Sequence, residues 1–312
     1  VSSDIKLIIS DGGKKKISKK IKKLFKKDSR IKYLPFPEDK SYIHYYKKIY
    51  KSLKFVKTKF VLFADNDDFF IYENIFKFIK FLENKNQYIG AGGTMIGFEM
   101  IKKNGKDFKL DNLNLIYEKI DLTKKNKIDR FNIFMKNFSD LPRNCIMKKD
   151  VLLKNYKLSS SFFGNNIEIK DHFTALFNII HGKIKIFNRP MIMHQNHSNS
   201  EGGKRYDAIL KNFSSKNFIK NLILFDKILS KKLKFKKNFV LESYFKNIIG
   251  RAIQNFSLKT EPSAKELYNL FISKLKRRMP QNKKKLYFRK KFYTNEIKKI
   301  VQNIEFFLKI NS

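Results

Sequence analysis

The stretch KFVLFADNDDFF, residues 59–70, sets a run of apolar residues directly before a cluster of carboxylates. Residues 60–64 have the length and apolar character of a buried strand, and the polar residues that follow end it. Asp65, Asp67 and Asp68 then share one turn. Carboxylate oxygens suit hard cations such as Mg²⁺ and Mn²⁺. The stretch therefore predicts a strand that brings metal-binding side chains to one end of a sheet.

Strand-like and helix-like segments alternate on both sides of this stretch. Strands are expected at residues 5–10, 31–34, 59–64 and 88–96, and helices at residues 14–27, 42–57 and 74–84. This alternation predicts an α/β fold, with a mixed and mostly parallel sheet between flanking helices. Ligands of such sheets bind beyond the carboxyl ends of the strands. Asp11, which follows the first of these strands, is therefore expected at the same edge as the acidic turn.

The remainder of the chain divides into three kinds of segment. Residues 102–129 are polar and poorly periodic, which predicts a loop or an insertion. A helix is expected at residues 168–180, a strand at 183–188, a flexible loop at 194–203, and helices at 208–212, 217–229, 239–255, 264–277 and 294–308. We therefore expect a catalytic α/β domain over residues 1–203 and a lysine-rich helical region over residues 204–312.

Two of these motifs resemble a known family. Residues 60–69 resemble the Asp-x-Asp segment of family 2 glycosyltransferases of the GT-A type, and residues 8–13, IISDGG, resemble the turn after the second strand of that fold. The resemblance implies that Asp11 contacts the nucleotide base and Asp65 the nucleotide. It also implies that Asp67 binds Mn²⁺ or Mg²⁺, with Asp68 sharing that role. Asp68 as a helix N-cap is the alternative.

A third match lies about one hundred residues further on. The family carries a Glu-Asp-like pair that opens a helix, with a Gly about eleven residues later. Here Lys170-Asp171 and Gly182 have that spacing. The resemblance implies that Asp171 is the catalytic base, because an ionised carboxylate can take the proton of an acceptor hydroxyl. Lys170 departs from the usual Glu, although Glu168 is nearby. The alternative is that Asp171 only caps a helix.

The loop after the last expected strand adds two weaker candidates. In some relatives a His at this point completes the metal shell, which implies His194 as a ligand or a pyrophosphate contact. His197 is a lesser candidate, and both can also be ordinary exposed loop residues. Arg205, after two glycines, is placed to close over a diphosphate. We expect this sequence to lack the first strand of the family's fold, because Val1 lies after the point where that strand would occur.

The formal charge of +41 restricts the partners less than its size suggests. Of the 69 basic residues only nine are Arg, and abundant Lys, Ile and Asn are typical of an AT-rich genome. Nucleic-acid recognition favours Arg, so a nucleic-acid partner is not expected. Weak attraction to the inner face of an anionic membrane fits better. Without a transmembrane run or signal peptide, and with Cys145 alone, a cytoplasmic protein with a buried structural thiol is expected.

These observations favour transfer of a sugar from a UDP- or GDP-sugar to a hydroxyl of a glycan or lipid-linked acceptor, with a metal ion and inversion at the sugar carbon. A basic nucleic-acid-binding or anionic-surface-binding protein is the second hypothesis, based on the charge alone. A nucleotidyltransferase is the third. It needs a glycine-rich phosphate loop, which Gly12-Gly13 followed by three lysines resembles poorly.

Overall fold

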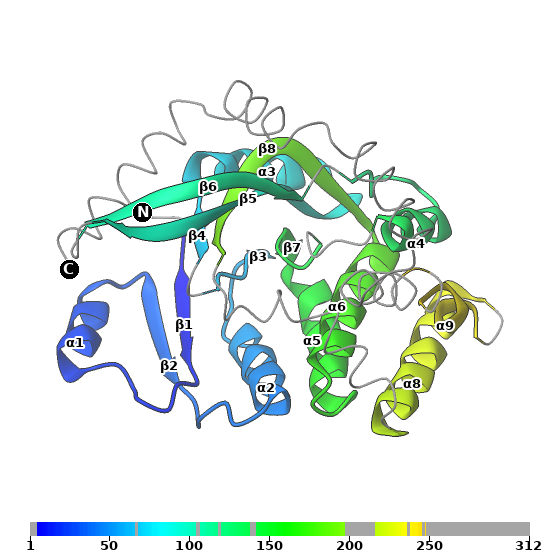
Figure 1. Ribbon diagram of the computed structural model, residues 1–312, viewed down its shortest axis with the longest axis horizontal. Coiled ribbons are helices and arrows are strands. Elements are labelled where there is room, and N and C mark those ends of the chain that lie inside the picture. Colours follow the sequence, from blue (N-terminus) through cyan, green and yellow to red (C-terminus); the bar gives the residue numbers. More distant parts are fainter. Residues whose placement is uncertain are drawn as a thin grey trace, which may run out of the picture.

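The computed structural model describes residues 5–65, 68–103, 107–117, 120–137, 142–196, 216–235, 238–244 and 247. Strands and helices alternate through most of this part of the chain (Figure 1). In chain order the elements are β1 (Leu7–Asp11), α1 (Lys19–Lys27), β2 (Ile31–Pro35), α2 (Tyr42–Leu53), β3 (Phe60–Val61), β4 (Asp68–Phe70), α3 (Tyr72–Asn84), β5 (Tyr88–Lys103), β6 (Asp107–Tyr117), α4 (Lys127–Lys136), β7 (Ile146–Lys148), α5 (Lys149–Ser161), α6 (Ile167–His181), β8 (Lys183–Gln195), α8 (Lys216–Leu233) and α9 (Phe239–Tyr244).

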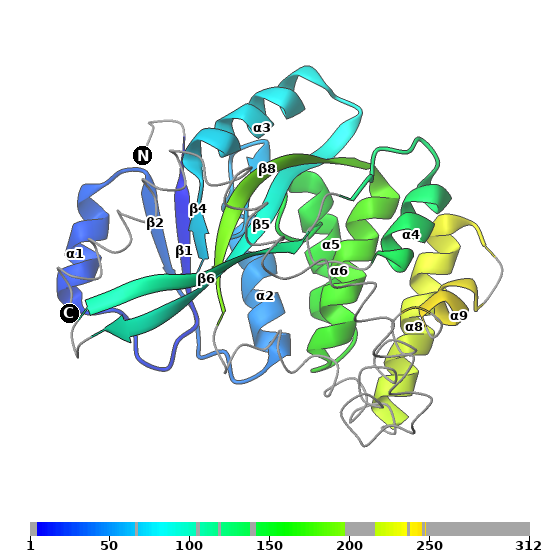
Figure 2. The ribbon, with the colours of Figure 1, turned by 45° about the horizontal axis from the view of Figure 1, so that its top comes forward.

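The N-terminal unit is a parallel pair of strands joined by a lysine-rich helix. β1 pairs with β2 from Leu7 opposite Ile31 to Asp11 opposite Pro35. α1 begins five residues later than its periodicity predicts, because the hydroxyl of Ser18 accepts a hydrogen bond from the amide of Ile21 and caps the helix there. The unit lies at one side of the molecule in both ribbon views (Figures 1 and 2).

The larger sheet is mixed and follows the order β3-β7-β5-β8-β4, with β6 paired to β5. The α/β fold with a mixed sheet and flanking helices is confirmed. The expectation of mostly parallel strands is wrong for the described residues, where only β1–β2 and β5–β8 pair in parallel. The short strands β3, β4 and β7 do not repeat the parallel strand–helix–strand connection that joins β1 to β2. They add antiparallel pairs, β7 to β5, β3 to β7 and β4 to β8.

The region expected to be a loop contains β6, which forms a long antiparallel ladder with β5. Its apolar alternation changes phase near Asn112, where the register shifts and φ is +51°. Phe108 and Leu110 fall on one phase and Leu113 and Leu115 on the other. The irregularity therefore hides the period of two that identifies a strand, and backbone pairing with β5 determines the structure instead.

α6 is the central helix of the core. Every residue from Glu168 to Ile180 is buried, and the helix contacts α4, α5, α8 and β8. A helix that is buried on all sides has no polar stripe, so its polar residues need partners inside the protein. Gly182 follows the helix where a Cβ would lie 2.4 Å from Ile89 Cγ2, which requires a residue without a side chain.

α8 and α9 extend this core on the side away from β1 and β2 (Figure 2). Phe218, Leu222, Phe225 and Leu229 of α8 lie in the same apolar cluster as Phe173 of α6. The predicted helix over residues 217–229 is confirmed and extends to Leu233, and the next begins at Phe239 as predicted. The other predicted C-terminal helices lie outside the described residues. The boundary after residue 203 stays a prediction.

Candidate active site

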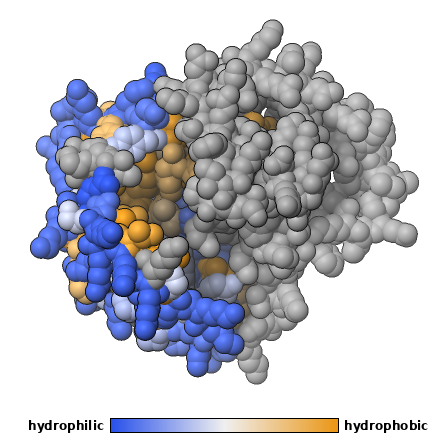
Figure 3. Space-filling view, turned by 90° about the vertical axis from the view of Figure 1, so that its left-hand side faces the viewer, coloured by the Kyte–Doolittle hydropathy of each residue, from blue (hydrophilic) through white to orange (hydrophobic). Residues whose placement is uncertain are grey.

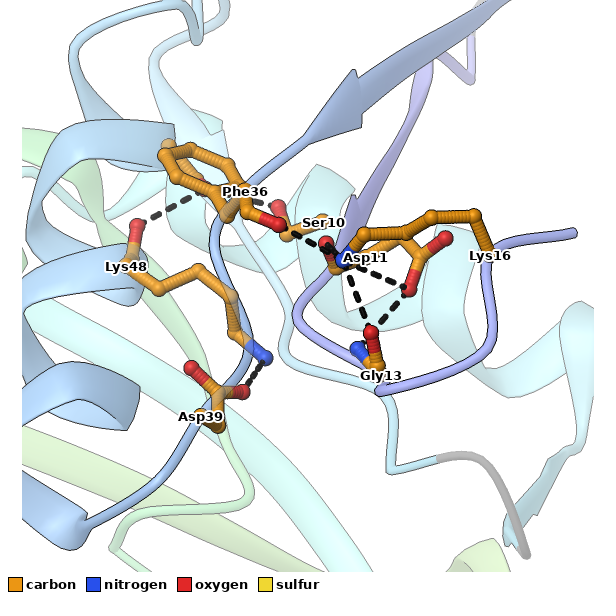
Figure 4. A network of polar contacts seen from close by, with 8 residues as sticks. Ser10, Asp11, Gly13, Lys16, Phe36, Asp39 and Lys48 are labelled. Atoms are coloured by element: carbon orange, nitrogen blue, oxygen red, sulfur yellow. Dashed lines mark hydrogen bonds and ion pairs between the residues drawn. The ribbon is translucent and has the colours of Figure 1, made fainter.

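Asp11 ends β1, and its carboxylate is held by several donors (Figure 4). The Tyr33 hydroxyl donates to Oδ2, the Gly13 amide donates to Oδ1 at 2.9 Å, and Lys16 Nζ lies 3.8 Å from Oδ1. Partial burial by itself raises the pKa of Asp11, but the hydrogen bonds from Tyr33 and Gly13 outweigh burial and lower it. The carboxylate at this turn is therefore ionised at neutral pH.

The turn after Asp11 is packed closely against Asp39. The Asp39 amide donates to the Gly12 carbonyl at 2.8 Å, and a Cβ on Gly12 would lie 2.1 Å from Asp39 Oδ2. Lys48 of α2 pairs with Asp39, and Ser10 donates to Ser52 of α2 at 2.7 Å. α2 therefore fixes both β1 and the segment that covers the glycine turn.

The acidic turn begins after a shorter strand than expected. β3 covers only Phe60–Val61, and the chain then runs on unpaired to Asp65, whose side chain is 40% exposed. Asp68 opens β4, and its amide donates to the Asp65 carbonyl at 3.3 Å. Asp67 lies outside the described residues, so its predicted role as a metal ligand stays a prediction.

Asp68 and His194 face each other across β4 and β8. The register places them opposite one another, and His194 Nδ1 lies 2.6 Å from Asp68 Oδ1. Their side chains are 4% and 29% exposed. A carboxylate and an imidazole are both ligands of Mn²⁺-like cations, so this pair fits the predicted metal. Within the described ranges no three His, Cys, Asp or Glu residues gather as a metal site.

Asp171 lies inside α6 rather than at its start. Asn166 is the N-cap and the helix begins at Ile167, so neither the predicted opening at Lys170 nor the alternative of Asp171 as an N-cap is correct. Asp171 is 3% exposed. The Tyr46 hydroxyl donates to its Oδ1, and Arg143 Nη1 lies 3.4 Å from its Oδ2. A charged side chain this deeply buried is held by partners from two other segments.

Arg143 joins two of the predicted site residues. Its Nη1 faces Asp171, and its Nη2 lies 3.6 Å from Asp65 Oδ2. The Asp171 carboxylate raises the pKa of Arg143 above its usual value against the opposing effect of burial. This arginine lies outside the sequence motifs that identify the other candidates. Its one signal is that it is an arginine in a chain whose bases are almost all lysine.

Lys170, which stands where the family resemblance expects Glu, is held mainly by backbone carbonyls of α5. Its Nζ donates to the carbonyls of Ser159 and, at 2.7 Å, Phe162, and it lies over the ring of Tyr46. These carbonyls end α5, where a cation is favourable. Burial lowers the pKa of Lys170 to about 8. The lysine therefore closes the end of α5.

The structure brings Asp65 and Asp171 together through Arg143, and Asp68 together with His194. Asp11 lies in a separate group on the β1 side of α2, which also carries Tyr46. Arg205 and His197 lie outside the described residues, so their predicted roles stay predictions. Cys145 is buried as expected, and burial raises the pKa of its thiol.

The comparison with protein families decides the identity of this arrangement. Residues 2–154 match the model of glycosyl transferase family 2. This chain is a family 2-type glycosyltransferase. The match includes the Asp11 turn, the acidic turn and Arg143, whereas Asp171 and His194 lie beyond its end. The resemblance drawn from residues 8–13 and 60–69 is thereby confirmed, and so is the enzyme class.

Three solved structures that are similar to this glycosyltransferase share little of its sequence. S. aureus TarS 1–349 has a TM-score of 0.45 and 14% identity, covering 82% of this chain and 66% of its own. The same protein in complex with UDP-GlcNAc has a TM-score of 0.43 and 13% identity, covering 80% and 71%. S. aureus TarS has a TM-score of 0.39 and 12% identity, covering 75% and 38%. This chain thus spans just under two thirds of the length of TarS 1–349. No curated protein matches.

Proposed function

We propose that the enzyme transfers a sugar from a UDP- or GDP-sugar to a hydroxyl group of a glycan or lipid-linked acceptor, with inversion at the sugar carbon. The observation that carries the proposal is the bridge made by Arg143. One guanidinium lies 3.6 Å from Asp65, the predicted nucleotide contact, and 3.4 Å from Asp171, the predicted base. Transfer requires the bound donor and the base to lie close together, and the bridge supports the proposal because it keeps Asp65 near Asp171.

In the proposed reaction Asp171 acts as the general base. A carboxylate oxygen of Asp171 accepts the proton of the acceptor hydroxyl while the hydroxyl oxygen attacks the anomeric carbon of the donor. The bond from that carbon to the phosphate oxygen breaks on the opposite face, and the nucleoside diphosphate leaves with the electron pair. The products are the inverted glycoside and a nucleoside diphosphate. Burial of Asp171, at 3% exposure, limits competition from water.

We further propose that Asp67, Asp68 and His194 hold Mn²⁺ or Mg²⁺. Asp68 and His194 support this role because the pairing of β4 with β8 brings a carboxylate and an imidazole together at the start of β4. A divalent cation bound there supplies positive charge that stabilises the leaving diphosphate. Asp11 and Asp65 contribute the nucleotide contacts in this proposal, and Arg205 a contact with the diphosphate.

The nucleotide and the metal can be tested together by thermal unfolding. We expect UDP or GDP to stabilise the protein in the presence of Mn²⁺, by about 2.7 kcal/mol at a concentration of one hundred times the dissociation constant. Asp67→Asn should lose this metal-dependent shift, whereas Asp129→Asn, an exposed Asp on α4, should keep it. Equal shifts with and without metal would remove the metal from the proposal. No shift with either nucleotide would refute the donor class.

Peripheral membrane binding is the second part of the proposal, and α1 supports it. Six of its nine residues are Lys, while Ile21 and Leu24 are 40% and 57% exposed. Hydrophilic residues surround a smaller apolar area on this side of the molecule (Figure 3). Basic helices with exposed apolar residues bind anionic lipid surfaces. None of the helices in the described ranges is long and apolar enough to cross a membrane. A cytoplasmic location stays a prediction.

Vesicle sedimentation tests this surface directly. At low salt we expect wild-type protein to bind phosphatidylglycerol vesicles and not phosphatidylcholine vesicles, since anionic headgroups attract lysines. Leu24→Asp should weaken binding several-fold because it places a carboxylate on the apolar side of α1. Ile223→Asp is the matched control, because Ile223 is 52% exposed on α8. Equal binding by wild type and Leu24→Asp would contradict a role for α1.

A further inference from the structure

We propose that Arg143 is a positioning residue that holds Asp65 and Asp171 at a fixed separation, so that the nucleotide contact and the base act on one donor. The inference rests on the proposed function. It assigns a role to a residue that lies in the loop before β7 and outside the family motifs.

Each oxygen of the Asp171 carboxylate has its own donor. The Tyr46 hydroxyl donates to Oδ1, and Arg143 Nη1 approaches Oδ2 at 3.4 Å. Two donors from different segments restrict both the position and the rotation of the carboxylate. The planar guanidinium also fixes where its second nitrogen points, so Asp65 is held relative to Asp171. A lysine ammonium at this position offers a single point charge and cannot span the two carboxylates in the same way.

The two ends of the bridge differ in exposure. The side chains of Asp171 and Arg143 are 4% and 19% exposed, whereas that of Asp65 is 40% exposed. The Asp171 end is therefore the fixed end. The Asp65 end is open to solvent, so a ligand can reach this carboxylate while Arg143 and Asp171 stay in place. This is the arrangement that a binding residue and a buried base require.

Aromatic residues line the bridge and keep it in a weakly polar environment. Tyr46 and Tyr156 are each 1% exposed and their rings lie 5.6 Å apart, with Phe63 against Tyr156 at 5.2 Å. Burial raises the pKa of Tyr45 to about 12, and burial also raises that of Tyr46, so these phenols are neutral at physiological pH. Attraction between the guanidinium and the carboxylates is stronger there than in water.

Arg130 shows that burial alone does not explain Arg143. Arg130 is 4% exposed, and its guanidinium donates to backbone carbonyls, including those of Ile179 at 2.6 Å and Lys124 at 2.7 Å. It closes the end of α6. Arg143 instead forms ion pairs with Asp65 and Asp171, two carboxylates that belong to the candidate site. Arg130 therefore binds backbone carbonyls, whereas Arg143 binds carboxylates of the candidate site. Arg130 can serve as the control for substitutions of Arg143.

A double-mutant cycle tests the bridge without requiring activity. Arg143→Gln, Asp171→Asn and the double variant are compared with wild type by urea unfolding. We expect the double variant to be more stable than additivity predicts, by about tenfold in the unfolding equilibrium constant, since each single change removes the charge that the other residue faces. Additive effects would refute the pairing on which the inference depends.

Kinetics distinguish positioning from a purely structural role. With release of nucleoside diphosphate as the assay, Arg143→Gln should lower kcat about tenfold to a hundredfold and change the donor KM much less. Added guanidinium should restore part of kcat, and Arg143→Lys should restore less than the native residue. Arg130→Gln should lower the unfolding midpoint, and guanidinium should not restore any activity that it loses. Unchanged kcat in Arg143→Gln, or a loss that guanidinium leaves as it is, would overturn the inference.

These outcomes separate the inference from the proposed function. A wild-type protein that neither binds UDP or GDP nor releases them from a sugar donor would refute the proposed function and the positioning role together. A wild-type protein that binds nucleotide and turns over donor, with Arg143→Gln equally active, would refute only the role of Arg143.

Discussion

Replacing Asp171 with Asn should lower sugar transfer by about 10²- to 10⁴-fold, the usual contribution of a general base. The amide keeps the size of the side chain and an oxygen that can accept from Tyr46, but it cannot take the proton of the acceptor. Asp171 is 3% exposed and has Tyr46 and Arg143 as partners, so the substitution removes a charge from a closed environment. Steady-state kcat with a UDP- or GDP-sugar donor and a hydroxyl acceptor measures the effect.

Asp226→Asn is the matched control for this substitution. Asp226 is also 3% exposed, but it lies on α8 and accepts from the backbone amides of Val240 and Leu241 at the start of α9. Its loss should destabilise the α8–α9 packing and leave kcat of the folded protein near wild type. A transfer rate within threefold of wild type in Asp171→Asn would remove Asp171 as the base. Nucleotide-induced stabilisation of that variant would show that its donor site is intact.

Restoring the family's Glu at position 170 should destabilise the protein by about 3 kcal/mol or more. Lys170 is fully buried and donates to the carbonyls of Ser159 and Phe162 at the end of α5. A carboxylate has no proton to donate at neutral pH and would face these carbonyls and the negative end of the helix dipole. Lys170→Glu should therefore lower the midpoint of urea unfolding substantially, although it makes the sequence more typical of the family.

Lys157→Glu provides the comparison. Lys157 is exposed on the last turns of α5. The same change from Lys to Glu there should alter the free energy of unfolding by only about 0.5 kcal/mol. If Lys170→Glu unfolds at the same urea concentration as Lys157→Glu, the lysine does not close α5 as described. The result would also reopen the question of how this chain departs from the family motif.

The elements that the sequence predicts well are those with a strong local signal. α3 and α6 have apolar residues at helical spacing over several turns, and β2 and the start of β5 are apolar runs between turn residues. The motifs at residues 8–13 and 60–69 are also local, since each needs only a strand followed by acidic residues. The family match over residues 2–154 confirms the resemblance that they support.

Elements whose structure depends on distant partners were predicted less well. β6 changes its apolar phase near Asn112, so only its pairing with β5 identifies it as a strand. α6 begins at Ile167, one turn before the pair that resembles the family's helix opening. The share of parallel pairing was overestimated because β3, β4 and β7 are short strands whose direction depends on their neighbours.

The sequence by itself determined the class of fold, the order of the acidic turns and the candidates for nucleotide, metal and base. The fold class follows from residue type and spacing within short segments, and the roles of the candidates follow from the family that those segments resemble. Only the tertiary structure decided which of the candidates meet. Tyr46 and Asp171 are 125 positions apart in the sequence, and no local pattern links them. Arg143 has no motif at all. It lies between two carboxylates because α5 packs against α2, α6 and β7, which makes charges that are distant in sequence neighbours in space.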